Sequence, residues 1–156
     1  MDCYLLNTDA KSMPDGRSPH GKWFEHGMVF CAEDTWGISK HKDMNHYGRN
    51  FTKLKPKDIC LMYVNDIGVV GVGEVIEEYD GKSYSGTEWL VYGPGANGFG
   101  TEHRIRVNWY KDLRNNPISY NKLMSIGIIP NSAFKHIVSS KERILELISR
   151  VPDLGK

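Results

Sequence analysis

The sequence predicts an α+β domain built round a small curved sheet or barrel. Strand-like runs recur about every 8 to 20 residues, a hairpin signature stands near the middle of the chain, and helical patterns flank these runs. The chain has 156 residues, which suits one domain with a sizeable core. We therefore expect residues 1–156 to form a single domain.

The hairpin signature is residues 58–76, DICLMYVNDIGVVGVGEVI. Two apolar runs, 59–64 and 69–76, flank Asn-Asp-Ile-Gly, and Asn, Asp and Gly tolerate the positive φ that tight turns need. Gly71 and Gly73 interrupt the second run and weaken it as a strand. They indicate bulges or barrel bends, or positions where another backbone or a flat ligand approaches closely.

Other segments have strand or helix character. In residues 104–110, RIRVNWY, the apolar Ile105, Val107 and Trp109 alternate with polar or basic residues, which predicts a half-buried strand with a basic outer face. Further strands are expected at 3–8, 28–31 and 89–92. Helices are expected at 44–54, from the turn at 116–119 through about Ser125, and at 139–148, the last opened by a capping box of Ser139 and Glu142. Residues 133–137, AFKHI, are expected to form a short capped turn.

The composition is that of an ordinary globular protein, with 40% hydrophobic and 25% charged residues. Without an apolar run near 18 residues or a basic N-terminal leader, neither a membrane span nor a signal peptide is expected. The three cysteines form no CxxC pair, so we expect buried free thiols in a reducing, cytoplasmic compartment. The six histidines lack metal-ligand spacing, and no metal or cofactor is predicted.

The net charge is only +1, but the basic residues are clustered. One group lies between Lys40 and Lys57, and another between His103 and Arg114. A local basic surface indicates nucleic-acid binding, although surface lysines also serve solubility.

The chain has no GxSxG, HExxH, P-loop or zinc-deaminase pattern, so we do not expect an enzyme. A nuclease activity would belong to another domain or subunit. Trp23, Trp36 and Trp89 each border a loop, and aromatic faces there can stack on an unpaired base. Each of these tryptophans could instead pack over the core, as we expect of Trp109.

The order of these motifs resembles the PUA-like superfamily, most closely its EVE and YTH-type domains. The resemblance covers about residues 3–125 and rests on CYLLNTD, TWGIS, the hairpin KDICLMYVNDIGVVGVGEV, a following tryptophan and HRIRVNWY. The hairpin is its most specific part, and Lys57-Asp58 stands where the family has Gly-Asp. The resemblance implies a PUA-like β-barrel with flanking helices that binds a modified base in an aromatic cage.

The resemblance also assigns roles to residues. Trp36 and Trp89 match the cage tryptophans, with Trp23 as a rival for the first place. Residues matched to polar contacts with the base edge are Asn7, Thr8, Asp9 and, less closely, Ser39. Residues expected to meet the nucleic-acid backbone are Lys40, Lys42, Arg49, Asn50, Lys53, Arg104 and Arg106.

The main hypothesis is a reader of a methylated or hydroxymethylated base flipped from duplex DNA, acting as the specificity module of a modification-dependent restriction system. Its partners would be modified DNA and a nuclease or NTPase domain or subunit, and the chain would be a domain of a longer protein. The alternative is an RNA-binding module that reads a modified nucleotide in RNA. An enzyme of the same superfamily and a protein-interaction domain with purely structural tryptophans remain open.

Overall fold

The computed structural model describes residues 1–8, 20–34, 53–80, 83–84, 99–130 and 134–154. The predicted helix at 44–54, apart from its last two residues, and the predicted strand at 89–92 lie outside these ranges. The described strands are β1 (Cys3–Asn7), β2 (Met28–Asp34), β3 (Ile59–Val64), β4 (Gly68–Val75), β5 (Ser83–Tyr84), β6 (Phe99–Asp112) and β7 (Phe134–Ile137). The described helices are α1 (His20–His26), α4 (Tyr120–Ser125) and α5 (Lys141–Ser149).

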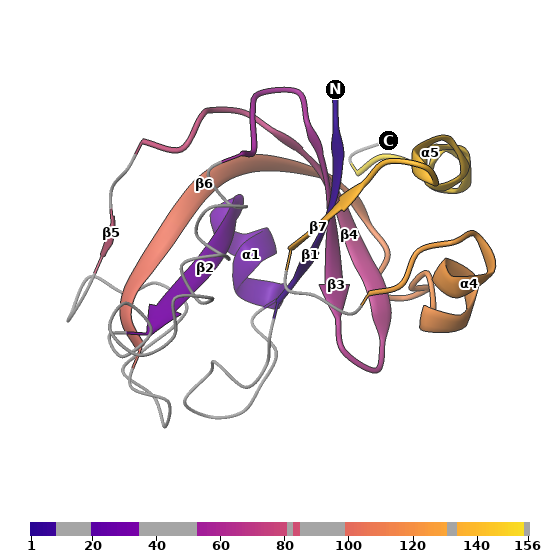
Figure 1. Ribbon diagram of the computed structural model, residues 1–156, viewed down its shortest axis with the longest axis horizontal. Helices are drawn as coiled ribbons and strands as arrows, with labels where there is room; N and C mark the ends of the chain where they lie inside the picture. Colours follow the sequence, from indigo (N-terminus) through magenta and orange to yellow (C-terminus); the bar gives the residue numbers. More distant parts are fainter. Residues whose placement is uncertain (9–19, 35–52, 81–82, 85–98, 131–133, 155–156) are drawn as a thin grey trace.

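The strands form one mixed sheet, in the order β2-β6-β4-β3-β1-β7, with β5 added on β6. Only the β1–β3 pair is parallel among the pairs described, and the others are antiparallel. β6 is long enough to pair with β2 through its first half and β4 through its second, and it arches across the sheet (Figure 1). In the described part of the chain β2 and β7 are not paired with each other, so the expected barrel closure stays a prediction.

Side-chain alternation divides the core into two clusters on opposite faces of the sheet. The inner cluster surrounds α1 and contains Tyr4, Leu6, Trp23, Cys60, Met62, Ile105, Val107, Trp109 and Phe134, among others. The outer cluster lies under α4 and α5 and contains Cys3, Leu5, Leu61, Tyr63, Leu123, Ile144 and Ile148, among others. Figure 1 shows α1 within the curve of the sheet and α4 and α5 on its other side. The predicted alternation of Ile105, Val107 and Trp109 with more exposed residues is confirmed.

The central hairpin forms as the sequence predicts. Asp66 and Gly68 have positive φ values of 67° and 125° in the turn that joins β3 to β4. Before β3, Lys57 has a φ of 76°, which is a left-handed conformation that favours glycine. Lys57 therefore occupies a strained backbone position.

Gly71 and Gly73 make room for aromatic rings of the inner cluster. A Cβ atom on Gly73 would lie 2.4 Å from Cγ1 of Val107 and 2.6 Å from Cε3 of Trp109, and one on Gly71 would lie 2.7 Å from Cζ of Phe24. The pairing of β4 with β6 also shifts register between Val72 and Gly73. The bulge expected at these glycines is thus present, and the close approach is made by the protein's own side chains.

Two local predictions near the C-terminus are wrong. Residues 134–137 form β7, antiparallel to β1, instead of a capped turn. Phe134 packs in the inner cluster and Ile137 in the outer one, and a strand puts residues three apart on opposite faces where a helix puts them on one. At α5 the N-cap is Ser140, whose buried side chain makes no capping hydrogen bond, so the proposed capping box starting at Ser139 does not form.

Candidate nucleic-acid interface

The polar end of β1 lies beside the hairpin turn because β1 and β3 run parallel. Asn7 donates a hydrogen bond from Nδ2 to Oδ1 of Asn65 at 2.9 Å. The Thr8 backbone N–H donates to the carbonyl of Tyr63 at 2.9 Å, and the Thr8 residue is fully buried. These two predicted base-edge residues are therefore neighbours at one end of the sheet.

Trp23 lies in α1 and is fully buried, as expected of a tryptophan that packs in the core and does not stack on a base. Its ring packs 6.3 Å from that of Phe30 and 6.4 Å from that of Trp109, between centroids. Its indole Nε1 has no hydrogen-bond partner, and it is the one buried side-chain nitrogen or oxygen of the described residues in this condition. A buried donor without an acceptor is unusual and costly.

A small pocket opens on the inner side of the β7 edge and is lined by Tyr4, Lys53, Phe134 and His136. Its volume is about 120 Å³. Tyr4 and His136 are directly paired across β1 and β7, and their rings stack with centroids 4.8 Å apart and planes 19° apart. We call it the edge pocket. It combines flat aromatic surface with the ammonium group of Lys53, the chemistry that holds a base and a phosphate.

Charge around the edge pocket is mixed. Nε2 of His136 lies 3.2 Å from Oδ1 of Asp2, with both side chains about half exposed. Burial, aided by the carboxylates of Asp58 and Asp2, raises the pKa of the Tyr4 phenol, which keeps it neutral and able to donate a hydrogen bond. The pocket therefore offers one lysine cation, one phenol donor and an imidazole that a carboxylate orients.

Sequence reasoning found only Lys53 of these four residues. The sequence predicts Tyr4 only as part of a strand, and Phe134 and His136 as part of a turn. The spacing of Phe134 and His136, two residues apart in a short run, is a strand signal that could have placed both on one face.

The two arginines predicted on β6 differ in their surroundings. Nε of Arg104 donates a hydrogen bond to Oε1 of Glu102 at 2.9 Å, and the Glu102 side chain is fully buried. Arg104 is therefore engaged in neutralising a buried carboxylate, whereas Arg106 is exposed. Of the two, Arg106 is better placed to meet a phosphate.

The remaining predicted site residues lie outside the described ranges, and nothing tests their roles. They are Asp9, Trp36, Ser39, Lys40, Lys42, Arg49, Asn50 and Trp89. Among the residues the structure does describe, no group of three or more His, Cys, Asp or Glu could hold a metal ion. None of the described helices is long and apolar enough to cross a membrane.

Comparison with known proteins gives a fold relationship. No protein-family model matches the chain, and no curated protein matches it significantly. A hypothetical protein from Leishmania major is similar in structure, with a TM-score of 0.54, 14% identity, and 96% of this chain and 95% of that chain covered. The Mmi1 YTH domain in complex with RNA gives a TM-score of 0.52 at 9% identity, over 95% of this chain and 77% of that one. A further structure of the Mmi1 YTH domain gives 0.50 at 12% identity, over 96% of each chain. The chain therefore has a fold similar to that of YTH domains.

Proposed function

We propose that this chain is an RNA-binding module that reads a modified nucleotide in RNA. The observation that carries the proposal is the edge pocket, which places stacked aromatic rings beside a lysine on a YTH-like sheet. The similar Mmi1 structure is described as a complex with RNA. The RNA alternative of the sequence-based prediction is therefore favoured over duplex DNA of a restriction system, for which the fold comparison offers no support.

The contacts would be physical, without covalent chemistry. An unpaired base would stack on the face of the His136 ring that Tyr4 does not cover, and Lys53 would neutralise a neighbouring phosphate. Stacking of a base on an aromatic side chain contributes about 1–3 kcal/mol. The modified base itself would enter a cage built by Trp36 and Trp89, with Asn7 at the polar end of β1 reading its edge. An enzyme activity is not part of this proposal.

The first experiment measures binding of fluorescently labelled single-stranded RNA by anisotropy at 0.1 M salt, with and without a methylated adenine or cytosine. Duplex DNA carrying the same marks is measured in parallel. We expect tighter binding to RNA than to duplex DNA, and a preference for one modified RNA that Trp36→Ala and Trp89→Ala abolish. Equal affinity for all modified and plain oligonucleotides would reject a reader, and preference for modified duplex DNA would restore the restriction-system hypothesis.

The second experiment tests the edge pocket. Because His136 and Lys53 are exposed, His136→Ala and Lys53→Ala should leave folding intact. We expect His136→Ala to weaken RNA binding by about 5- to 150-fold, the equivalent of one lost stacking contact. Lys53→Ala should weaken binding of every sequence and reduce the salt dependence by about one phosphate contact. The matched control is Lys122→Ala on α4, an exposed lysine outside the edge pocket, and RNA affinity unchanged in both pocket variants would contradict the assignment.

A further inference from the structure

A second concave surface lies on the outer side of the sheet, between α4 and α5. Two adjoining pockets share Lys122, Leu147 and Arg150, and their volumes are about 180 and 330 Å³. The larger volume is at the lower end of the range for ligand pockets, about 300–1,000 Å³. We call the two together the outer groove.

The floor of the outer groove is aliphatic. It is formed by Leu113, Pro117, Ile118, Ile126, Leu147 and Val151. In contrast to the edge pocket, the residues that line it include no aromatic ring. Bases stack on aromatic faces, so this floor suits aliphatic side chains better than nucleotides.

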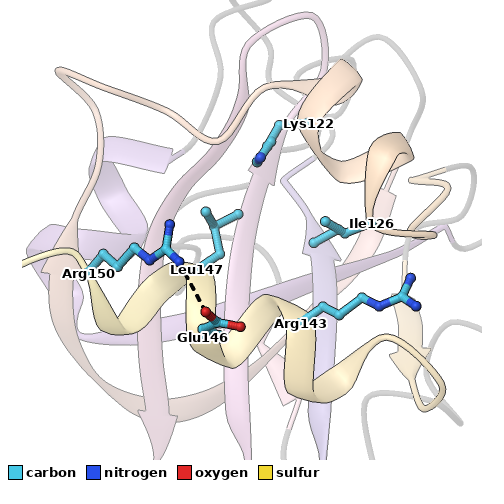
Figure 2. A pocket seen from close by; sticks show the side chains of 6 residues that line it. All are labelled: Lys122, Ile126, Arg143, Glu146, Leu147 and Arg150. Atoms are coloured by element: carbon cyan, nitrogen blue, oxygen red, sulfur yellow. Dashed lines mark hydrogen bonds and ion pairs between the residues drawn. The ribbon is translucent and has the colours of Figure 1, made fainter.

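The rim of the outer groove is mainly cationic. Figure 2 shows Lys122 reaching from α4 toward Leu147 on α5, with the guanidinium of Arg150 beside Leu147 and Arg143 at the other end. Glu146 is the one carboxylate that lines the groove, and it pairs with Arg150 at 3.0 Å in a bridge whose side chains are 70% and 71% exposed. An exposed pair of this kind is weak, so Arg150 can exchange Glu146 for an incoming carboxylate.

We propose that the outer groove binds a short acidic peptide segment of a partner protein, with an aliphatic side chain on the floor and flanking Asp or Glu residues on Lys122, Arg143 and Arg150. The occupant follows from charge complementarity with the rim and from the aliphatic floor. This site is independent of RNA binding, because it lies on the face of the sheet opposite the edge pocket. The protein would then hold RNA on one face and a protein partner on the other.

The test is selection of a random 12-residue peptide library, displayed on phage, against the whole chain. We expect enrichment of peptides that combine Leu, Ile or Val with Asp or Glu. Synthetic peptides from the enriched pool should lose at least tenfold in affinity for Lys122→Glu/Arg143→Glu and for Leu147→Ala. The matched control is Lys22→Glu/Lys53→Glu, which changes net charge equally, alters α1 and the edge pocket, and should keep peptide affinity unchanged.

The outcomes separate this proposal from the RNA proposal. Peptide binding that fails in the outer-groove variants but survives in the control supports the docking site, whether or not the protein binds RNA. No enriched acidic–aliphatic pattern, or enriched peptides that bind the charge-reversed groove as well as wild type, would overturn it. It would equally be overturned if Lys122→Glu/Arg143→Glu abolished RNA binding while no peptide competed, since the groove would then be a nucleic-acid surface.

Discussion

The two faces of the sheet are built from the same strands but from different kinds of side chain. The inner cluster contains Trp23, Phe30, Trp109 and Phe134, whereas the outer cluster is almost entirely Leu, Ile and Val. Alternate residues of one strand supply both, as Cys60 and Leu61 of β3 do. The difference teaches that strand alternation separates an aromatic face, suited to flat ligands, from an aliphatic face that carries two helices.

The first prediction compares the loss in free energy of unfolding when one large side chain of each cluster is replaced by alanine. Trp109→Ala should lower the free energy of unfolding by about 3–5 kcal/mol, because Trp109 packs against Trp23 and Phe24 and donates from Nε1 to the carbonyl of Met28. Ile144→Ala in the outer cluster should cost somewhat less, about 2–4 kcal/mol, since fewer atoms are removed. Urea denaturation measures both, and a larger loss for Ile144→Ala would reverse the ranking of the two faces.

The second prediction concerns the glycine that accommodates the inner aromatic rings. Gly73→Ala should destabilise the protein by about 1–3 kcal/mol, because its Cβ would lie 2.4 Å from Val107 and 2.6 Å from Trp109. The matched control is Gly21→Ala in α1, where no heavy atom lies within 4 Å of the added Cβ. That control should be neutral or stabilise the helix by up to about 1 kcal/mol. Thermal denaturation compares the two, and similar effects would mean that β4 yields to the added methyl group.

The third prediction concerns Lys57, whose backbone is strained just before β3. This strand supplies side chains to both faces of the sheet. Lys57→Gly should stabilise the protein by about 0.5–1 kcal/mol, because glycine adopts the φ of 76° without Cβ strain. Lys55→Gly is the control, since Lys55 does not have a positive φ, and it should be slightly destabilising. The denaturant midpoints of both variants and of the wild type measure these changes. An equal loss of stability in both variants would show that Lys57 is not strained.

The smallest expected effect is a pH dependence on the inner side. Burial, with the nearby Arg114 cation, lowers the pKa of His20 on α1. The unfolded chain therefore binds more protons, so the contribution of His20 to stability is present above its ordinary pKa of 6.5 and falls as the pH drops below that value. Denaturation midpoints at pH 7.5 and 5.5 should show a decrease that His20→Gln reduces. An unchanged decrease in His20→Gln would exclude His20 as its source.

A second titratable group, Asp112, makes the stability depend on pH in a separate, more acidic range. The hydrogen bond from Arg114 lowers the pKa of Asp112, so its contribution is present above 3.8 and is lost as the pH falls through the lowered pKa. Asp112→Asn should remove this part. Because the Asp112 carboxylate raises the pKa of His20 and so opposes its lowering, the variant should keep the decrease between pH 7.5 and 5.5 and slightly enlarge it. Loss of both changes in Asp112→Asn would mean that the two groups titrate as one unit.

Cys3 and Cys60 are buried free thiols, as the sequence predicts, and one lies on each face of the sheet. Cys3 lies in the outer cluster and Cys60 in the inner one, and both are buried and unpaired. Burial raises the pKa of Cys3 to about 12 and raises that of Cys60 as well. Both thiols are therefore poor nucleophiles in the folded protein.

The sequence by itself determined the features whose causes are local. The turn chemistry of residues 65–68 determined the hairpin, and the alternation of residues 104–110 determined which side of β6 is buried. Ser119, whose side chain accepts a hydrogen bond from the backbone of Lys122, determined the start of α4. Each depends on residues a few positions apart, which a sequence shows directly.

The tertiary structure alone decided the features that depend on distant partners. Residues 134–137 become a strand because β1 offers an edge with unpaired backbone groups, a partner more than 120 residues away in sequence. The same pairing stacks His136 on Tyr4 and creates the edge pocket with Lys53. The outer groove likewise exists only because α4 and α5 cover the same face of the sheet. The local propensity of such a segment is similar for a turn, a helix or a strand. Hydrogen bonding and burial against distant parts of the fold decide which of these forms.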